Sequence, residues 1–301
     1  MQINGRDPTE VEEHVHMLVE RGLVRGVAAH SHLQLHQQLG AGAVKLGCEV
    51  HEGRGPFLLL VHGVLSSRAQ WQSNLPALRR VARPVVVELW GHGRSPSPEN
   101  PTLYQPAGYV RAFEEIRAAL GVERWLVCGQ SLGAALTLRY ALDHPDRCIA
   151  HVFTNSVSAL ADADWVVQTR ASAAGLADAI EQGGVAVIER LPIHPRRATR
   201  IPPAAHRALL EDVALLDPGG VARTFRYTVP DSSVRERAAE NRVPALLVCG
   251  ERETRFRAHR EFAERTMPYL EVVGIDAGHA VNLEAAEAFT VAVCEFLGRP
   301  R

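Results

Sequence analysis

The chain turns sharply at Gly129-Gln130-Ser131-Leu132-Gly133. An apolar run at residues 124–128 comes before this stretch, and a helix-prone run at residues 134–142 follows it. A strand, a tight turn and a helix in this order are the context in which a G-x-S-x-G pattern indicates a nucleophilic serine. A serine on so tight a turn has a strained backbone, which requires neighbours without bulk. We therefore predict that Ser131 is a nucleophile and that the Leu132 N–H, in the first helical turn, faces a developing oxyanion.

The composition is that of an ordinary globular protein. The 301 residues are 46% hydrophobic and 22% charged, with a formal net charge of −1, so neither sign favours binding to nucleic acid or to a membrane surface. No signal peptide is visible, and the longest apolar run, near residues 57–65, is too short to span a bilayer. His32 and His36 are spaced like zinc ligands, but no third ligand accompanies them. We expect a cytoplasmic protein without a metal and without nucleic-acid or membrane partners.

Hydrophobic patterning divides the chain into four segments. Residues 1–42 predict a helical N-terminal arm, which is either a packing arm or a contact in a homodimer. Residues 43–156 and 241–301 alternate apolar runs with amphipathic helices, which predicts an α/β fold with a mostly parallel, doubly wound sheet. Residues 157–240 break this alternation with Ala- and Arg-rich stretches that prolines interrupt. This segment predicts a helical cap inserted over the ends of the strands.

Sheets of this kind bind their ligands at the carboxyl ends of the strands. Val64, Ser131 and Asn155 all follow predicted strands and therefore fall at that edge. We predict that Asn155 and Gln130, the residue before Ser131, contact the substrate. A serine hydroxyl also needs a base, and the base needs a third group to orient it. The best candidate for the base is His279, in a glycine-containing loop after the last predicted strand.

Three carboxylates compete to orient this histidine. Glu253 follows the strand predicted at residues 244–249, and enough chain separates it from His279 for one helix and one strand. Glu251 and Asp276 lie near the ends of the same two strands. We favour Glu253, for which a role in a surface ion pair is the alternative.

These motifs together resemble the α/β-hydrolase fold family, specifically its capped serine esterases. The resemblance covers about residues 43–299 and rests on His62-Gly63, Gly91-His92-Gly93-Arg94-Ser95, the turn at Ser131, Gly278-His279 and Glu284. The family's order of nucleophile, acid and histidine implies Ser131, Glu253 and His279 as a catalytic triad.

The resemblance has further implications for individual residues. It implies an oxyanion hole formed by the N–H groups of Val64 and Leu132, and it implies that His62 and residues 91–95 brace the loops around that hole. Most relatives have an aspartate where this chain has Glu253, and a glutamate is one methylene longer.

The chemistry expected from these features is acyl transfer to water. Haloalkane dehalogenases and epoxide hydrolases of this fold place aspartate where this chain has Ser131, and no G-x-G-x-x-G fingerprint for a nucleotide cofactor is present. We expect a serine hydrolase without a cofactor, which cleaves a small-molecule ester, thioester or lactone through an acyl-enzyme. The alternatives are a perhydrolase, acyltransferase or cofactor-free oxygenase on the same triad, or a non-catalytic ligand-binding member of the fold.

Overall fold

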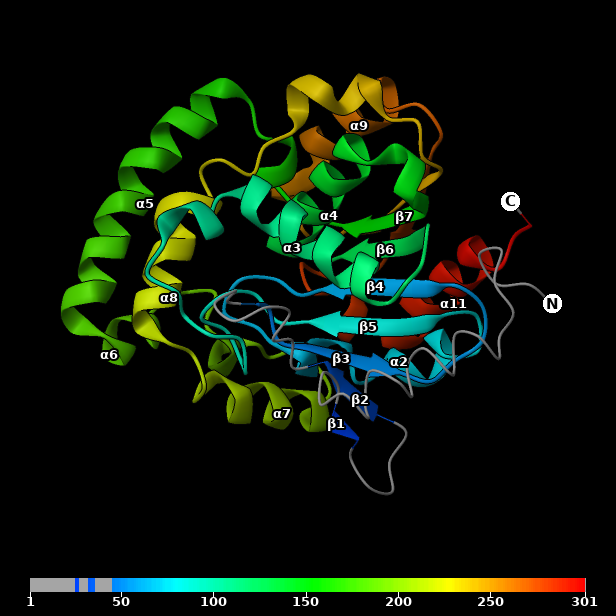
Figure 1. Ribbon diagram of the computed structural model, residues 1–301. Helices are drawn as coiled ribbons and strands as arrows, with labels where there is room; N and C mark the ends of the chain where they lie inside the picture. Colours follow the sequence, from blue (N-terminus) through cyan, green and yellow to red (C-terminus); the bar gives the residue numbers. More distant parts are fainter. Residues whose placement is uncertain (1–24, 27–31, 36–44, 301) are drawn as a thin grey trace.

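The computed structural model describes residues 25–26, 32–35 and 45–300. Across these residues, nine strands form one sheet in the order β1-β2-β3-β5-β4-β6-β7-β8-β9 (Figure 1). The strands are β1 (Arg25–Gly26), β2 (His32–Leu35), β3 (Cys48–His51), β4 (Phe57–Val61), β5 (Arg83–Val87), β6 (Trp125–Gly129), β7 (Cys148–Thr154), β8 (Ala245–Gly250) and β9 (Leu270–Ile275). The pairs from β5 to β9 are parallel, whereas β1, β2 and β3 are antiparallel to their neighbours.

Helices cover both faces of this sheet, which is why its central strands are continuously apolar. Every residue of β4 and β6 is buried. One face packs against α3 (Pro106–Ala119), α4 (Leu132–Asp143) and α9 (Arg257–Thr266). The opposite face packs against α2 (Leu75–Leu78) and α11 (Ala286–Leu297), and the short helix α10 (Val281–Glu284) precedes α11. The predicted doubly wound, mostly parallel sheet is therefore confirmed.

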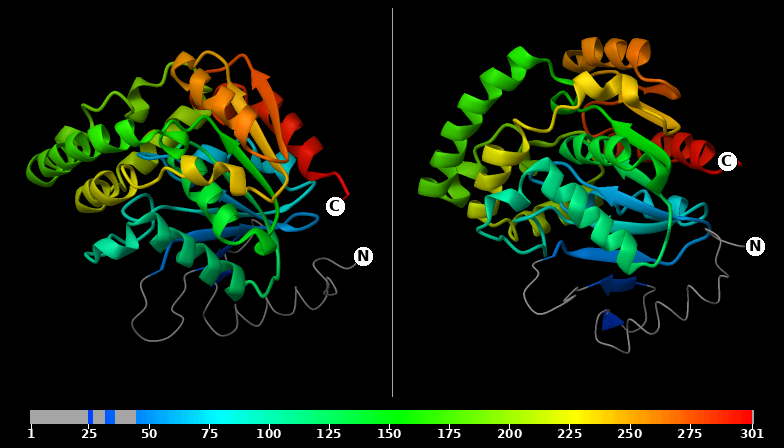
Figure 2. Two further views of the ribbon diagram at one scale, coloured as in Figure 1. Left: turned by 90° about the horizontal axis from the view of Figure 1, so that it is seen from above. Right: turned by 45° about the horizontal axis from the view of Figure 1, so that its top comes forward.

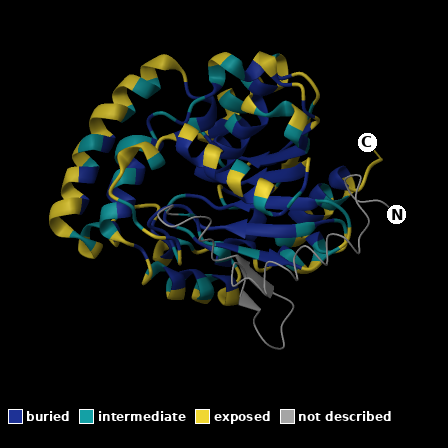
Figure 3. Ribbon diagram, in the orientation of Figure 1, coloured by how far each residue is buried: buried dark blue, intermediate teal, exposed yellow. Residues whose placement is uncertain are grey.

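The chain between β7 and β8 is helical. It contains α5 (Ala163–Gly183), α6 (Val185–Ile188), α7 (Pro203–Val213) and α8 (Pro218–Arg223), followed by a π-helical turn, η6 (Thr224–Thr228). These helices lie together at one end of the strands in all views (Figures 1 and 2). Apolar residues of α5, α6, α8 and η6 pack around Leu65, in the loop after β4. The outer side of α5 is exposed (Figure 3), and no helix in the described residues is long and apolar enough to cross a membrane.

The N-terminal arm differs from the predicted helix where it is described. β1 and β2 are extended and pair antiparallel, and β2 continues the pairing to β3. His32 lies on β2, in the run His32-Leu-Gln-Leu35, whose alternation of polar and apolar residues is typical of a strand. The rest of the predicted arm, including His36, lies outside the described residues.

Candidate active site

Ser131 occupies the junction between β6 and α4, where its backbone has φ 54° and ψ −117°. A positive φ is strained for a residue with a side chain. The two flanking glycines allow this turn because a Cβ on Gly129 would lie 2.3 Å from the Gly133 carbonyl oxygen. A Cβ on Gly133 would lie 2.2 Å from the carbonyl oxygen of Val61, at the end of β4. The close approach of α4 to β6 and β4 therefore requires both glycines. The turn leaves Ser131 partly exposed.

Three side chains from distant parts of the sequence meet at this turn. His279 Nε2 lies 2.8 Å from Ser131 Oγ, and His279 Nδ1 lies 2.9 Å from Glu253 Oε2. The His279 side chain is 47% exposed, whereas that of Glu253 is only 10% exposed. An alcohol, an imidazole and a buried carboxylate thus form a continuous hydrogen-bonded chain, the arrangement that activates a serine nucleophile.

The three candidate acids differ in their contacts with His279. Glu253 alone among them contacts His279 in the described structure. Glu251 is exposed and pairs with Arg260 at 3.4 Å, and Asp276 is exposed and pairs with Arg252 at 2.5 Å. The extra methylene of glutamate is therefore accommodated, and Glu251 and Asp276 belong to surface ion pairs.

The charge of Glu253 is favoured where it sits. Burial of the side chain acts to raise its pKa, but the hydrogen bond and charge of His279, with a further hydrogen bond from Asn155, outweigh burial. The net effect is that the pKa of Glu253 lies below its ordinary value. The carboxylate is therefore ionised at neutral pH, as an orienting group for an imidazolium must be.

The loop after β4 lies directly beside the nucleophile. A Cβ on Gly63 would come within 3.1 Å of the Ser131 Cβ. The Gly63 N–H donates to Gln70 Oε1 at 3.1 Å, and the Leu65 N–H donates to His92 Nε2 at 3.2 Å. Within the described part of the chain, the Val64 N–H between them has no acceptor.

Leu132 provides the second predicted N–H of the oxyanion hole. It is the first residue of α4, and N–H groups in the first turn of a helix have no acceptor within that helix. The helix dipole also favours negative charge at this end. The predicted oxyanion hole thus pairs the Leu132 N–H at the start of α4 with the Val64 N–H in the loop beside Ser131.

Two buried neutral histidines brace the loops around the site. His62 Nδ1 lies 2.7 Å from the Gly63 carbonyl oxygen, and its Nε2 accepts from the Leu89 N–H at 3.1 Å. His92 Nδ1 lies 2.9 Å from the Trp90 carbonyl oxygen. Each ring therefore donates through Nδ1 and accepts at Nε2, which requires the neutral form. Burial supports the neutral form, because it lowers the pKa of His62 to about 4. Burial, together with the nearby His62, lowers the pKa of His92 to about 3.

Asn155 and Gln130 make different contacts from those predicted. Asn155 is fully buried, and its Nδ2 donates to Glu253 Oε2 at 2.9 Å and to the Gly250 carbonyl oxygen at 3.0 Å. Its Oδ1 accepts from the Gly250 N–H at 3.0 Å. Gln130 is 3% exposed, and its Nε2 donates to the His279 carbonyl oxygen at 3.1 Å. Both amide side chains therefore form their hydrogen bonds within the protein. A position at the rim, which the sequence predicts, does not determine which way a side chain points.

No feature of the sequence indicated an ion-paired contact between the helical segment that joins β7 to β8 and the rest of the chain. Arg94 Nη2 donates to Asp212 Oδ1 at 2.7 Å, and Ser67 Oγ donates to Asp212 Oδ2 at 2.7 Å. Arg94 also contacts the buried Glu88 at 3.2 Å. No pattern marks this contact, because Asp212 lies on α7, far along the chain from its partners.

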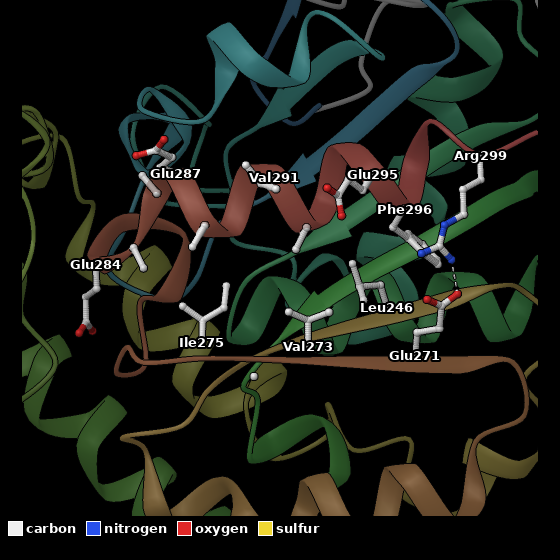
Figure 4. A pocket seen from close by; sticks show the side chains of 15 residues that line it. Leu246, Glu271, Val273, Ile275, Glu284, Glu287, Val291, Glu295, Phe296 and Arg299 are labelled. Carbon is white, nitrogen blue, oxygen red and sulfur yellow. Dashed lines mark hydrogen bonds and ion pairs between the residues drawn. The ribbon is translucent and has the colours of Figure 1, made fainter.

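A groove elsewhere on the molecule is separate from the triad. It has a volume of about 860 Å³ and lies between β9 and α11 (Figure 4). Val273, Ile275 and Val291 line it, with carboxylates such as Glu295 at its edge. Ser131 and its two partners do not line this groove.

The chain belongs to the α/β-hydrolase fold family, whose model matches residues 56–286. A Bacillus subtilis (strain 168) protein, described as a putative 2-succinyl-6-hydroxy-2,4-cyclohexadiene-1-carboxylate synthase, is 26% identical over 256 residues, which are 80% of this chain and 89% of that protein. Among solved structures, a hydrolase from Pseudomonas aeruginosa PA01 is 25% identical with a TM-score of 0.66, covering 86% of this chain and all of that one (100%). MenH from S. aureus is 17% identical with a TM-score of 0.74, covering 83% of this chain and 97% of that one. The resemblance stated from the motifs is thereby confirmed at the level of the family and the fold.

Proposed function

We propose that this protein is a serine hydrolase, which cleaves a small-molecule carboxylic ester, thioester or lactone through an acyl-enzyme. The observation that carries the proposal is the unbroken hydrogen-bonded chain from Ser131 Oγ through His279 to Glu253, at 2.8 and 2.9 Å. The strained turn at Ser131 and the N–H groups of Val64 and Leu132 beside it support the same chemistry. Membership of the family agrees with an enzyme of this type.

The proposed reaction has two steps. His279 Nε2 removes the proton of Ser131 Oγ as that oxygen attacks the substrate carbonyl carbon, and the Val64 and Leu132 N–H groups bind the resulting oxyanion. Collapse of this intermediate breaks the bond to the alcohol or thiol, which leaves with the proton from His279. A water then attacks the acyl-enzyme, again with His279 as base, and releases the acid and free Ser131. Glu253 holds the imidazole and stabilises its cation throughout.

The surroundings of Val64 favour an apolar acyl group. Val64 is partly buried and packs against the apolar cluster around Leu65 that the helical insertion forms. Partly buried Val213 and Val229 pack against the same cluster. An apolar acyl chain entering beside the oxyanion loop would therefore replace water at apolar surface, which favours binding.

Active-site labelling and ester hydrolysis test the proposal. A fluorophosphonate probe should label the wild type at Ser131, and Ser131→Ala should abolish labelling and lower turnover of p-nitrophenyl esters by at least about a thousandfold. Ser158→Ala is a matched control, because Ser158 also lies at the carboxyl end of the strands, and it should label and turn over normally. Hydrolysis by Ser131→Ala at the wild-type rate would refute the proposal.

Product analysis distinguishes the alternative activities on the same triad. With an ester as acyl donor, adding peroxide or an alternative acyl acceptor should leave the free acid as the main product. A peracid or a transferred acyl group as the main product would instead identify a perhydrolase or an acyltransferase. A wild-type protein that binds esters but neither labels nor turns over would be a ligand-binding member of the fold.

A further inference from the structure

Three buried amide side chains form a closed hydrogen-bonded cluster between helix α10 and residues 70–74, which follow the loop after β4. Gln70, Asn74 and Asn282 are each at most 2% exposed. Asn282 Nδ2 donates to the Gln70 carbonyl oxygen at 3.0 Å and to Asn74 Oδ1 at 3.2 Å. In return, Gln70 Nε2 donates to Asn282 Oδ1 at 3.3 Å, and Asn74 Nδ2 donates to the Asn282 carbonyl oxygen at 2.9 Å. A buried cluster satisfied in this way is rigid, because each lost hydrogen bond would leave an unpaired polar group.

The two ends of this cluster reach the two halves of the site. At one end, Gln70 Oε1 accepts from the Gly63 N–H, which fixes the peptide next to Val64. At the other end, Asn282 lies in α10, three residues beyond His279. The cluster therefore ties the loop of the predicted oxyanion hole to the helix that follows the predicted base.

Gln130 makes a second connection between the same two halves of the site. Its Nε2 donates to the His279 carbonyl oxygen at 3.1 Å. Its Oε1 lies beside Gly63, so close that a Cβ there would be 2.5 Å away. The Gln130 N–H donates to the Val61 carbonyl oxygen at 3.0 Å, which anchors the residue to the end of β4.

We infer that Gln70, Asn282 and Gln130 are positioning residues, which hold the Val64 N–H and the His279 imidazole in one fixed relation around Ser131. The inference rests on the proposed function, since it assigns these amides a role in the same reaction. Its physical basis is that a displacement of about 1 Å between reacting groups can cost on the order of a hundredfold in rate. Neutral amides suit this role because each both donates and accepts without adding a charge beside the triad.

Two isosteric variants and a matched control test the inference. Asn282→Leu and Gln70→Met remove the hydrogen bonds of the cluster while preserving volume. Asn241→Leu is the control: Asn241 is equally buried, and its Nδ2 donates to the carbonyl oxygens of Val243 and Pro268 at 2.8 and 2.7 Å. Asn241 precedes β8 and therefore lies at the opposite end of the strands from the triad. If Asn282→Leu fails to fold, Gln130→Met, which removes the hydrogen bond to the His279 carbonyl oxygen, serves in its place.

Amide hydrogen exchange provides a measurement that does not depend on activity. In Asn282→Leu, exchange over residues 62–65 should accelerate at least about tenfold, although the substitution lies far away in the sequence. In Gln130→Met, exchange should accelerate over residues 62–65 and over residues 278–281. In Asn241→Leu, the exchange rates over both segments should stay within about twofold of the wild type, even if its melting temperature falls as much as that of Asn282→Leu.

Kinetics complete the test. On a p-nitrophenyl ester, each positioning variant should lose about ten- to a hundredfold in kcat with KM within about threefold, because an interaction made in the transition state is impaired. Unchanged exchange over residues 62–65 in Asn282→Leu, or an equal loss of kcat in Asn241→Leu, would overturn the inference. A wild type that is not labelled at Ser131, yet shows the exchange coupling, would refute the proposed function while supporting the link between the loops.

Discussion

Replacing Glu253 by glutamine tests the site most directly, because it removes one charge and almost no volume. Glu253 Oε2 accepts from both His279 Nδ1 and Asn155 Nδ2 at 2.9 Å, and an amide oxygen can still accept both. What is lost is the attraction between the carboxylate and the imidazolium that forms when Ser131 is deprotonated. For unit charges about 4 Å apart at an effective dielectric constant of about 20, this attraction is about 4 kcal/mol. That energy corresponds to about a thousandfold in rate.

The assay is steady-state hydrolysis of a p-nitrophenyl ester, in which Glu253→Gln should lower kcat about a thousandfold with little change in KM. Glu251→Gln and Asp276→Asn are the controls, because both carboxylates are exposed and pair with arginines; each should stay within about twofold of the wild type. Glu253→Asp should be intermediate, since it keeps the charge but shortens the side chain. A loss in either control equal to that of Glu253→Gln would show that the wrong carboxylate has been assigned.

Two further predictions concern the loop beside the nucleophile and stability in acid. Gly63→Ala should lower kcat at least about tenfold, because its Cβ would lie 2.5 Å from Gln130 Oε1; a kcat equal to that of the wild type would contradict the close approach. The free energy of unfolding should fall as pH drops from about 6.5 to about 4. Burial lowers the pKa of His62, His92 and His151 from 6.5 to about 4, 3 and 3, so the unfolded chain takes up these protons first. Each histidine then contributes a slope of up to about 1.4 kcal/mol per pH unit. Urea denaturation across this range should show the fall, with a shallower slope in His151→Gln; an unchanged slope would contradict the account.

The core of the fold was predictable because its signals are local. The fully buried strands β4 and β6 are continuous apolar runs, and the turn at Ser131 has glycines where close approach demands them. The strands β1 and β2 were not predictable, because such short segments become strands only by pairing, β2 with the edge of β3 and β1 with β2.

The site was predictable in its members but not in all of their contacts. Order along the chain selects Ser131 and His279, but three carboxylates fall at the same rim, and only side-chain geometry selects Glu253. For the same reason, the sequence did not indicate that the side chains of Asn155 and Gln130 form hydrogen bonds within the protein. Whether a polar side chain at a strand end faces the substrate or the protein depends on residues distant in sequence, such as Gly250 for Asn155.

Backbone strain connects the nucleophile with the buried histidines. Ser131 and Leu65 both have positive φ, of 54° and 55°, and each such residue costs on the order of 1–3 kcal/mol unless its surroundings hold it. Leu65 is held through its N–H, which needs the unprotonated Nε2 of His92 as acceptor. A protonated His92 would be a donor there, and the two N–H groups would repel each other. The burial that lowers the pKa of His92 to about 3 therefore also protects the peptide next to Val64 at neutral pH, where Glu253 is ionised. Stability and the predicted oxyanion hole thus depend on the same buried, neutral ring.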